Sequence, residues 1–373
     1  MYSEMIKIIE GGLLGDKYRV YSYSKKLIEE LENENEILLA NKIKKLIENK
    51  KSTIAVVEQF SGKPVDQESR MDMVQIDIPK ENNSIILDKR TEKEIDDFIS
   101  IIKGRNELLK HGINENMSML LYGYPGCGKT SIAEIIANKI KLPLITVRFD
   151  TIISSLLGST SKNIRKVFEY ASDKPCVLFL DEFDVIAKAR DDKNEVGELK
   201  RVVNTLIQNM DLYINSGGIL IAATNHEELL DTAIWRRFGY VLEIKKPSKI
   251  EIQRFIEQLL DQYNFDIDKD NKIKKLSEVF EEMSYAEIKR VIMSVIKKAI
   301  INEEKFLNYV DLIYEIYIQK KYDIRDEKEL IKFLRNSEVT QLEINQRLNI
   351  PLRKIREIEG ENEWKSFLSL KWI

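Results

Sequence analysis

The chain has 373 residues, of which 43% are hydrophobic and 32% are charged. This composition supports a sizeable core and argues against a mostly disordered chain. The 59 basic and 62 acidic side chains leave a net charge of −3, so composition alone points neither to nucleic acid nor to an anionic membrane. No apolar run reaches the ~18 residues that span a bilayer, and the N-terminal residues lack a signal-peptide pattern.

The two cysteines, Cys127 and Cys176, each lie in or beside a motif described below. We therefore expect no disulfide and a reducing, cytoplasmic environment. The two histidines, His111 and His226, show no spacing typical of metal ligands, and both are interpreted as structural residues.

In chain order, residues 1–50 repeat apolar side chains every three or four positions, which predicts a helical domain. Residues 51–90 indicate a connector with one or two short strands. In residues 91–246, a helix over about 92–110 is followed by short apolar runs that alternate with helical patterns. This alternation predicts an α/β domain whose parallel sheet is covered on both faces. The predicted strands cover residues 119–122, 144–149, 176–180, 219–223 and 240–244.

The remaining chain is predicted to be helical, first over residues 247–322 and then in a tail over residues 323–373. The expected helices of the first part cover residues 249–263, 272–282, 285–303 and 306–320. In the tail, residues 339–356 fit a helix-turn-helix with a basic second helix. Asn345 stands where such motifs favour a small apolar residue, and the chain is not basic overall. A docking or oligomer-capping tail is therefore favoured over DNA binding.

Residues 123–130 read GYPGCGKT and match the phosphate-loop pattern G-x-x-x-x-G-K-[ST], with an apolar strand before them and a helix after. Glycines let backbone N–H groups converge on phosphate oxygens, and the helix start adds unpaired donors. Lys129 is expected to reach the β- and γ-phosphates of ATP, and the Thr130 hydroxyl to ligate Mg²⁺. The expected nucleotide-binding residues of this segment are Pro125, Gly126, Cys127, Gly128, Lys129, Thr130 and Ser131.

A second motif lies about fifty residues further on, where four apolar residues precede Asp181 and Glu182. Ligands of open α/β sheets bind at the carboxyl ends of the strands, which is where these two carboxylates stand. Asp181 is expected to support the Mg²⁺ shell, and Glu182 to position or deprotonate the attacking water.

Over residues 85–320 these motifs, in this order, resemble the AAA+ ATPase family in its AAA branch. Residues 221–225 (IAATN) resemble the strand that carries sensor 1, which implies that Asn225 helps to orient the lytic water. Residues 231–238 (DTAIWRRF) resemble the arginine-finger segment without its usual Pro-Gly spacer. The resemblance implies that Arg237 is the main finger toward a neighbouring subunit's γ-phosphate and that Arg236 supports it.

The resemblance also implies further contacts with the nucleotide. Gly112 and Ile113, before the first core strand, match the region that cradles the adenine. Residues 284–288 (SYAEI) resemble the start of the helix of the lid domain, residues 247–322. Ala286 stands there where this branch often has a small residue in place of a sensor-2 arginine. Asp211 follows the family pattern at the subunit interface.

Three further positions carry hypotheses with plainer alternatives. Residues 154–158 (SSLLG) align with a central pore loop, where Leu156 replaces the aromatic residue of protein-threading relatives. The alternative for this segment is an ordinary helix and loop. The charged residues 191–195 lie near a second pore loop in the family, or form a solvated loop. Cys127 stands at a helix start that can lower a thiol pKa, so its alkylation is hypothesised to block nucleotide binding. A tolerated small residue is the alternative for Cys127.

The resemblance implies a homo-oligomeric ring, expected to be a hexamer, that uses ATP and Mg²⁺ to remodel a macromolecule, with protein as the favoured substrate. The layout also resembles stand-alone bacterial AAA ATPases beside subtilisin-like proteases in phage-defence or plasmid-stability cassettes. An ATP-dependent DNA-acting switch or loader, and a slow nucleotide-gated scaffold, are the alternatives. No membrane partner is expected. The N-terminal helices fit either an adaptor or a structural bundle.

Overall fold

The computed structural model describes residues 2–13, 17–33, 36–48, 62–66, 70–78, 85–154, 157–184, 196–230, 232–263, 265–267, 272–321 and 326–360. The chain falls into two compact units, which interleave along the sequence. The first comprises residues 1–83, 97–121 and 133–241. The second comprises residues 84–96, 122–132 and 242–373.

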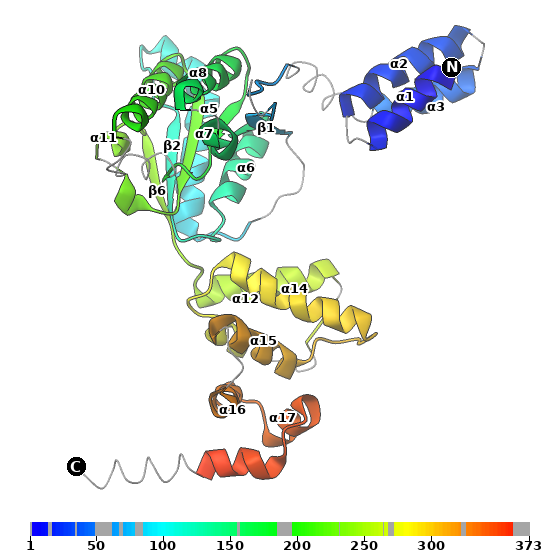
Figure 1. Ribbon diagram of the computed structural model, residues 1–373, viewed down its shortest axis with the longest axis vertical. Helices are drawn as coiled ribbons and strands as arrows, with labels where there is room; N and C mark the ends of the chain where they lie inside the picture. Colours follow the sequence, from blue (N-terminus) through cyan, green and yellow to red (C-terminus); the bar gives the residue numbers. More distant parts are fainter. Residues whose placement is uncertain are drawn as a thin grey trace. The chain divides into compact units, whose positions relative to one another are not determined.

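The N-terminal residues form the helices α1 (Tyr2–Leu13), α2 (Lys17–Asn33) and α3 (Ile37–Glu48). Helix α2 packs against both α1 and α3 (Figure 1). Leu27, Ile28 and Leu31 of α2 and Ala40 of α3 are buried at their centre. The helical period in the sequence therefore reflects a small apolar core between these three helices.

A six-stranded sheet has the strand order β1-β3-β4-β5-β2-β6. Its strands are β1 (Val74–Asp77), β2 (Ser118–Gly123), β3 (Leu144–Val147), β4 (Val177–Leu180), β5 (Ile219–Thr224) and β6 (Tyr240–Ile244). Strands β3, β4 and β5 are parallel, as the sequence predicts, whereas β1 pairs with β3 in the antiparallel direction. The sheet is therefore mixed, because the connector before the α/β domain adds an edge strand to it.

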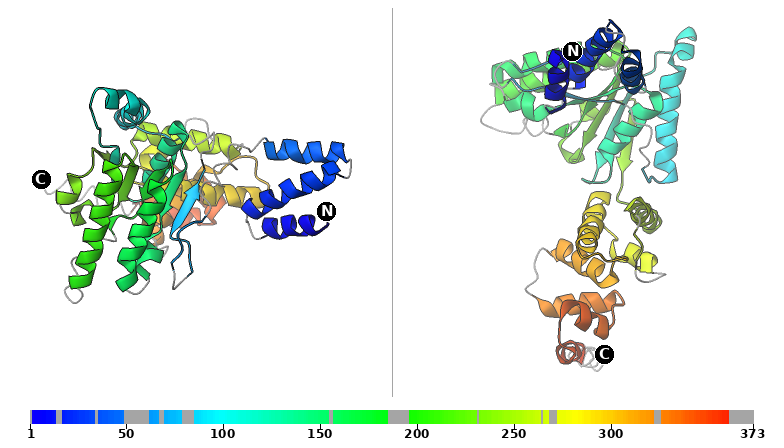
Figure 2. Two further views of the ribbon diagram at one scale, coloured as in Figure 1. Left: turned by 90° about the horizontal axis from the view of Figure 1, so that it is seen from above. Right: turned by 90° about the vertical axis from the view of Figure 1, so that its right-hand side faces the viewer.

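Helices flank the strands of this sheet (Figure 2). They are α5 (Lys89–Lys110), α6 (Lys129–Ile140), α7 (Phe149–Ser154), α8 (Leu157–Ser172), α10 (Val196–Asn215), the 3₁₀ turn η1 (Glu227–Leu229) and α11 (Thr232–Trp235). Apolar residues of α7, α8, α10 and α11 share one core with β1, β3, β4 and β5. All four residues of β4 are buried, which is typical of a strand covered on both faces.

The second unit contains a succession of helices whose apolar faces form one continuous core. They are α12 (Lys249–Tyr263), α13 (Lys272–Val279), α14 (Tyr285–Ile301), α15 (Tyr309–Lys321), α16 (Glu327–Asn336), α17 (Gln341–Leu348) and a helix over residues 352–360. Ile331 of α16 and Ile355 of the last helix are fully buried in this core. The expected lid and tail thus pack together.

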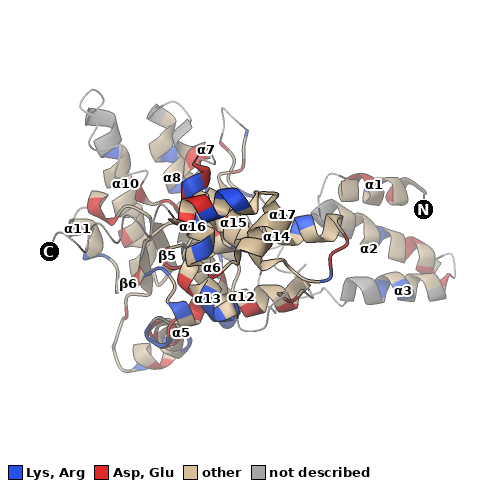
Figure 3. Ribbon diagram, turned by 90° about the horizontal axis from the view of Figure 1, so that it is seen from below, with Lys and Arg blue, Asp and Glu red and all other residues tan. Residues whose placement is uncertain are grey.

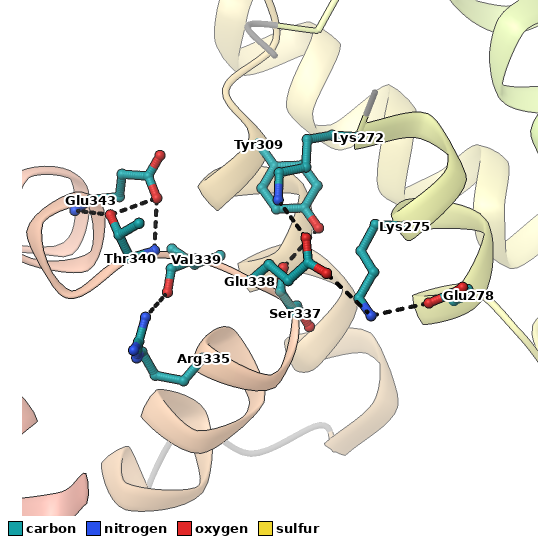
Figure 4. Close-up of polar contacts among 10 residues, drawn as sticks. All are labelled: Lys272, Lys275, Glu278, Tyr309, Arg335, Ser337, Glu338, Val339, Thr340 and Glu343. Atoms are coloured by element: carbon teal, nitrogen blue, oxygen red, sulfur yellow. Dashed lines mark hydrogen bonds and ion pairs between the residues drawn. The ribbon is translucent and has the colours of Figure 1, made fainter. Parts of the chain in front are cut away.

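Polar contacts add to this packing at the turn between α16 and α17 (Figure 4). The Glu338 carboxylate lies 2.9 Å from the Lys272 ammonium and 3.7 Å from that of Lys275. The buried Tyr309 hydroxyl donates to the carbonyl oxygen of Ser337 at 2.9 Å. These bonds join α13 and α15 to the tail, and their buried member contributes about 1 kcal/mol.

The tail contains two consecutive helices, α17 and the helix over residues 352–360, joined by a short turn. Helix α17 ends at Leu348 and is capped by Asn349, whose φ of 56° is the left-handed conformation that closes many helices. The Asn345 side chain donates its amide to the carbonyl oxygen of Ile350 at 2.9 Å. Asn345 is tolerated at this packed position because its polar group satisfies a carbonyl of the turn.

Within the described ranges, no helix combines the length and apolar character that crossing a bilayer requires. Basic and acidic residues are interspersed along the helices in Figure 3. The same described ranges contain no group of three or more His, Cys, Asp or Glu residues that could hold a metal ion.

Candidate active site

The phosphate loop joins the end of β2 to the start of α6. Gly123, Gly126 and Gly128 all have positive φ angles, of 131°, 75° and 101°. Such angles favour glycine, because other L-residues are strained there. A Cβ atom at Gly126 would also lie 2.8 Å from the Ala286 Cβ and from the Ser284 Oγ. Both the backbone angles and the close packing explain why these positions are glycine.

Lys129 opens helix α6 and is buried. Its ammonium donates to the carbonyl oxygens of Gly123 and Tyr124, at 2.7 and 2.9 Å. The side chains of Thr130 and Ser131 are exposed in the same first turn. A polyphosphate with Mg²⁺ requires a cation, a hydroxyl ligand and N–H donors. Lys129, Thr130 and the first turn of α6 offer these groups. The loop therefore fits the expected nucleotide.

Two segments contact this loop within the second unit. On one side, the backbone N–H of Ala286 donates to the carbonyl oxygen of Gly126 at 3.1 Å. On the other, Ile85 Cδ1 lies 3.0 Å from where a Cβ of Gly128 would stand. The sequence predicted the Ala286 side, but it did not indicate Ile85. The sequence feature that could have indicated this segment is Asp88, a residue type that often caps a helix start. Its carboxylate accepts the backbone N–H groups of Arg90 and Thr91 at the start of α5.

Gly112 and Ile113 lie at the C-terminal end of α5. Gly112 has a φ of 73°, and its N–H donates to the carbonyl oxygen of Leu109. The N–H of Ile113 donates to the carbonyl oxygen of Leu108. These two bonds terminate the helix in the manner of a glycine cap. The role of both residues toward adenine stays a prediction.

The carboxylate pair follows β4 directly. The Asp181 carboxylate accepts the backbone N–H of Glu182 at 2.9 Å. Glu182 is exposed and has a φ of 52°, a conformation that costs a non-glycine residue about 1 kcal/mol or more. Strained residues persist where the surrounding structure holds them, and they cluster at functional sites.

The ends of β4 and β5 are held together just beyond this pair. The Phe183 N–H donates to the carbonyl oxygen of Ala223 at 2.9 Å. The buried Asp184 carboxylate accepts the Thr224 hydroxyl at 3.2 Å. Asn225, half-buried, is the next residue after β5. The structure thus brings the end of β5 beside the carboxylate turn, and the role of Asn225 toward the lytic water stays a prediction.

The two arginines after α11 differ in their surroundings. Arg237 is 30% exposed, and its Nε lies 3.1 Å from a carboxylate oxygen of Asp211 on α10. Its guanidinium also donates to the carbonyl oxygen of Ala233. Arg236 is exposed, and no ion pair with it is found among the described residues. This geometry favours Arg236 as the outward-reaching side chain, in the reverse of the expected order.

Cys127 is buried, with 1% of its surface exposed. Burial raises the pKa of its thiol, and the nearby ammonium groups of Lys129 and Lys246 offset only part of this effect. The pKa of Cys127 is therefore not lowered, because desolvation outweighs the charges at this helix start. This supports the alternative of a tolerated small residue, and the alkylation hypothesis stays untested.

Several predicted positions lie outside the described residues. They are Leu156 of the first pore-loop segment, the charged residues 191–195, and Asp231 of the arginine segment.

Comparisons with known proteins agree with these features. Residues 119–246 match the model of the family described as "ATPase family associated with various cellular activities (AAA)". A protein of Sinorhizobium fredii, named "Uncharacterized AAA family ATPase y4kL", is 38% identical over 284 residues. The match covers 76% of this chain and 84% of that protein.

Two archaeal relatives are less similar. A putative 26S proteasome regulatory subunit homolog of Methanothermobacter thermautotrophicus is 33% identical over 54% of this chain. A proteasome-activating nucleotidase of Methanococcus maripaludis is 29% identical over 69% of this chain. The matches span 55% and 64% of the length of these two proteins.

A solved structure has the same fold. It is described as "Crystal structure of FIGL-1 AAA domain", and it aligns with a TM-score of 0.54 at 18% sequence identity. The alignment covers 70% of this chain and 91% of that one.

Proposed function

The chain belongs to the AAA family of ATPases and hydrolyses ATP, and from this premise we propose that it is a ring-forming motor that remodels a protein substrate. The observation that carries the proposal is the phosphate loop, in which three glycines and the buried Lys129 form a cradle for a polyphosphate. The domain boundaries proposed with it lie near residues 50, 90, 246 and 322.

Each site residue has a proposed role. Lys129 holds the β- and γ-phosphates of ATP, while Pro125, Cys127 and the loop glycines shape the backbone around them. Thr130 and Asp181 would hold Mg²⁺, which would neutralise charge on the phosphates when bound. Glu182 accepts the proton of the attacking water, and Asn225 orients that water. The exposed, strained position of Glu182 supports this role, because strain is kept where function needs it.

The ring is proposed because an arginine finger acts on the nucleotide of a neighbouring subunit. The exposed Arg236 is proposed to reach the γ-phosphate bound by a neighbouring copy, where a guanidinium would stabilise the charge of the transition state. Arg237, held by Asp211, would position the segment. A hexamer is the proposed state.

Protein is the proposed substrate, since two relatives are named after the proteasome. A third relative, the peroxisomal ATPase PEX1 of Saccharomyces cerevisiae, is 33% identical over 49% of this chain and 18% of its own length. A cytoplasmic location and a subtilisin-like protease partner in phage defence form the narrower proposal.

A DNA-acting switch is the second candidate, because residues 341–360 have helix-turn-helix geometry. However, two basic residues of the last helix are already paired with carboxylates. Arg353 lies 3.0 Å from Glu357, and Lys354 pairs with Glu327 of α16. A helix that binds phosphates needs a surplus of cations. The ion pairs therefore favour a docking role for the tail.

The deciding experiment measures which macromolecule stimulates the ATPase of the full chain. We expect an unfolded protein such as casein to raise the rate and duplex DNA to leave it unchanged. Leu156→Ala should reduce the response to casein, while the double variant Arg353→Ala/Arg356→Ala should retain it. Stimulation by DNA that this double variant loses would instead establish the DNA switch. A rate indifferent to both would indicate a nucleotide-gated scaffold.

A further inference from the structure

The phosphate loop lies between two segments that are far apart in the sequence. Ile85 packs on the Gly128 side of the loop, with its Cδ1 atom 3.0 Å from the position of a Cβ there. Ala286, at the start of α14, donates its N–H to the Gly126 carbonyl oxygen at 3.1 Å. We call residues 85–88 and 284–286 together the clasp. Both halves of the clasp contact the loop through its glycines.

One side chain joins the two halves of the clasp. The Tyr285 hydroxyl donates to the carbonyl oxygen of Ile86 at 3.0 Å, across 199 positions of sequence. The Tyr285 ring meets the ring of Phe255 edge to face, with centroids 4.9 Å apart. A tyrosine hydroxyl keeps its proton at neutral pH and is therefore a donor, and burial raises the pKa of the Tyr285 phenol further.

Tyr285 stands on a rigid support. The Ser284 hydroxyl accepts the backbone N–H of Glu287, and the Glu287 carboxylate accepts the backbone N–H of Ser284. This capping box fixes the first turn of α14, to which both Tyr285 and Ala286 belong. A displacement of residues 85–88 would therefore be transmitted through the hydrogen bond between the Tyr285 hydroxyl and Ile86 to the turn that contacts Gly126.

We infer that Tyr285 is a positioning residue for an adenine nucleotide: its bond to Ile86 holds the clasp closed and keeps the phosphate loop in its binding conformation. The inference rests on the proposed role of the loop in binding ATP. Tyr285 acts through Ile86 and through its helix, so it needs no contact with the nucleotide. Its loss should weaken nucleotide binding more than turnover, because Glu182 and Asn225, the residues proposed to act on the attacking water, belong neither to the clasp nor to the loop.

Tyr285→Phe tests the inference in the full chain, since it removes only the hydroxyl. Tyr309→Phe is the matched control, because it removes a phenol-to-carbonyl bond of 2.9 Å between α15 and the tail, away from the loop. Calorimetry with ADP and Mg²⁺ should give a Kd about fivefold higher for Tyr285→Phe, the effect of one net hydrogen bond. The KM for ATP should rise similarly, with kcat within about twofold. Tyr309→Phe should lower the Tm and leave the ADP Kd and the KM for ATP unchanged.

Hydrogen exchange provides a readout that a merely structural role would not change. ADP should slow exchange of the amides of residues 85–92 in the unaltered chain, and much less in Tyr285→Phe. Phe255→Leu, which removes the ring that supports Tyr285, should shift the ADP Kd in the same direction by a smaller factor.

The outcomes separate this inference from the proposed function. If the unaltered chain binds ADP and Tyr285→Phe binds it with the same Kd, the positioning role is wrong while the site stands. If the unaltered chain binds no ADP, or if Lys129→Ala binds it equally well, the proposed site is wrong as well. An equal rise in Kd for Tyr285→Phe and Tyr309→Phe would assign the effect to general destabilisation and overturn the inference.

Discussion

The Nε atom of Arg237 lies 3.1 Å from a carboxylate oxygen of Asp211, and this pair joins the segment after α11 to helix α10. The carbonyl oxygen of Arg237 in turn accepts the amide of Asn116 at 2.8 Å. Arg237 is thus held at both its side chain and its backbone. Its neighbour Arg236 is exposed and is the arginine proposed to act on a neighbouring subunit.

Arg236→Ala should lower kcat by about a thousandfold and leave the ADP Kd unchanged, because a finger arginine stabilises only the transition state. Arg237→Ala should lower both kcat and the Tm, since it also removes the pair with Asp211. Steady-state assays and thermal melts measure both effects. An Arg237 variant with a normal Tm and the larger loss of kcat would restore the order that the sequence suggested.

Mixing provides a second test of the arginine. Arg236→Ala and Glu182→Gln subunits, each inactive alone, should regain activity when combined, because some interfaces then hold an intact Arg236 beside an intact Glu182. A mixture that stays as inactive as its components would show that Arg236 does not act between subunits.

Glu182→Gln should bind ATP within about threefold of the normal affinity and turn it over at least about a hundredfold more slowly. The substitution keeps the size of the side chain and removes its basicity. Single-turnover assays and calorimetry distinguish binding from chemistry. Glu169→Gln, at an exposed carboxylate on α8, is the control and should leave the rate unchanged. A normal rate in Glu182→Gln would remove this residue from its role.

Burial raises the pKa of Cys176 to about 11, and the folded chain therefore keeps a proton that the unfolded chain releases near pH 9. The resulting stability is fully present below pH 9 and is lost as the pH rises toward 11. Over this window the unfolding free energy should fall by about 2 kcal/mol more in the unaltered chain than in Cys176→Ala. Urea titrations at pH 7, 9 and 10.5 measure the difference. Parallel pH profiles would contradict it.

Ile355→Ala should destabilise the second unit by about 2–4 kcal/mol, because Ile355 is fully buried in the core that the tail shares with α12–α15. Leu342→Ala, at a side chain that is 57% exposed on α17, should cost less than about 0.5 kcal/mol. Urea unfolding followed by circular dichroism compares the two variants. A separate early transition of the tail in Ile355→Ala would show that tail and lid unfold independently.

Local patterns were sufficient to predict much of the fold and the loop. The predicted strand over residues 240–244 coincides with β6, and the predicted helix over residues 249–263 coincides with α12. Both patterns depend on neighbouring residues only. The phosphate loop could be predicted for the same reason, since its glycines and Lys129 are consecutive.

Long-range contacts could not be predicted in this way. The bond from Tyr285 to Ile86 and the pair of Arg237 with Asp211 join residues 199 and 26 positions apart, and neither leaves a periodic trace in the sequence. The raised pKa of Cys127 likewise depends on burial, which only the folded chain defines. These long-range contacts and the burial of Cys127 could therefore be found only in the structure.

Strand β1 determines where the chain can be shortened. It covers the outer edge of β3, and the Asp66 carboxylate ahead of it accepts the Asn163 amide of α8 in a buried bond of 2.7 Å. A truncated protein that starts at residue 85 would leave the backbone N–H and C=O groups of β3 open to strands of other molecules, which promotes aggregation. The smallest well-behaved ATPase fragment should accordingly begin before residue 62, well upstream of the family match at 119.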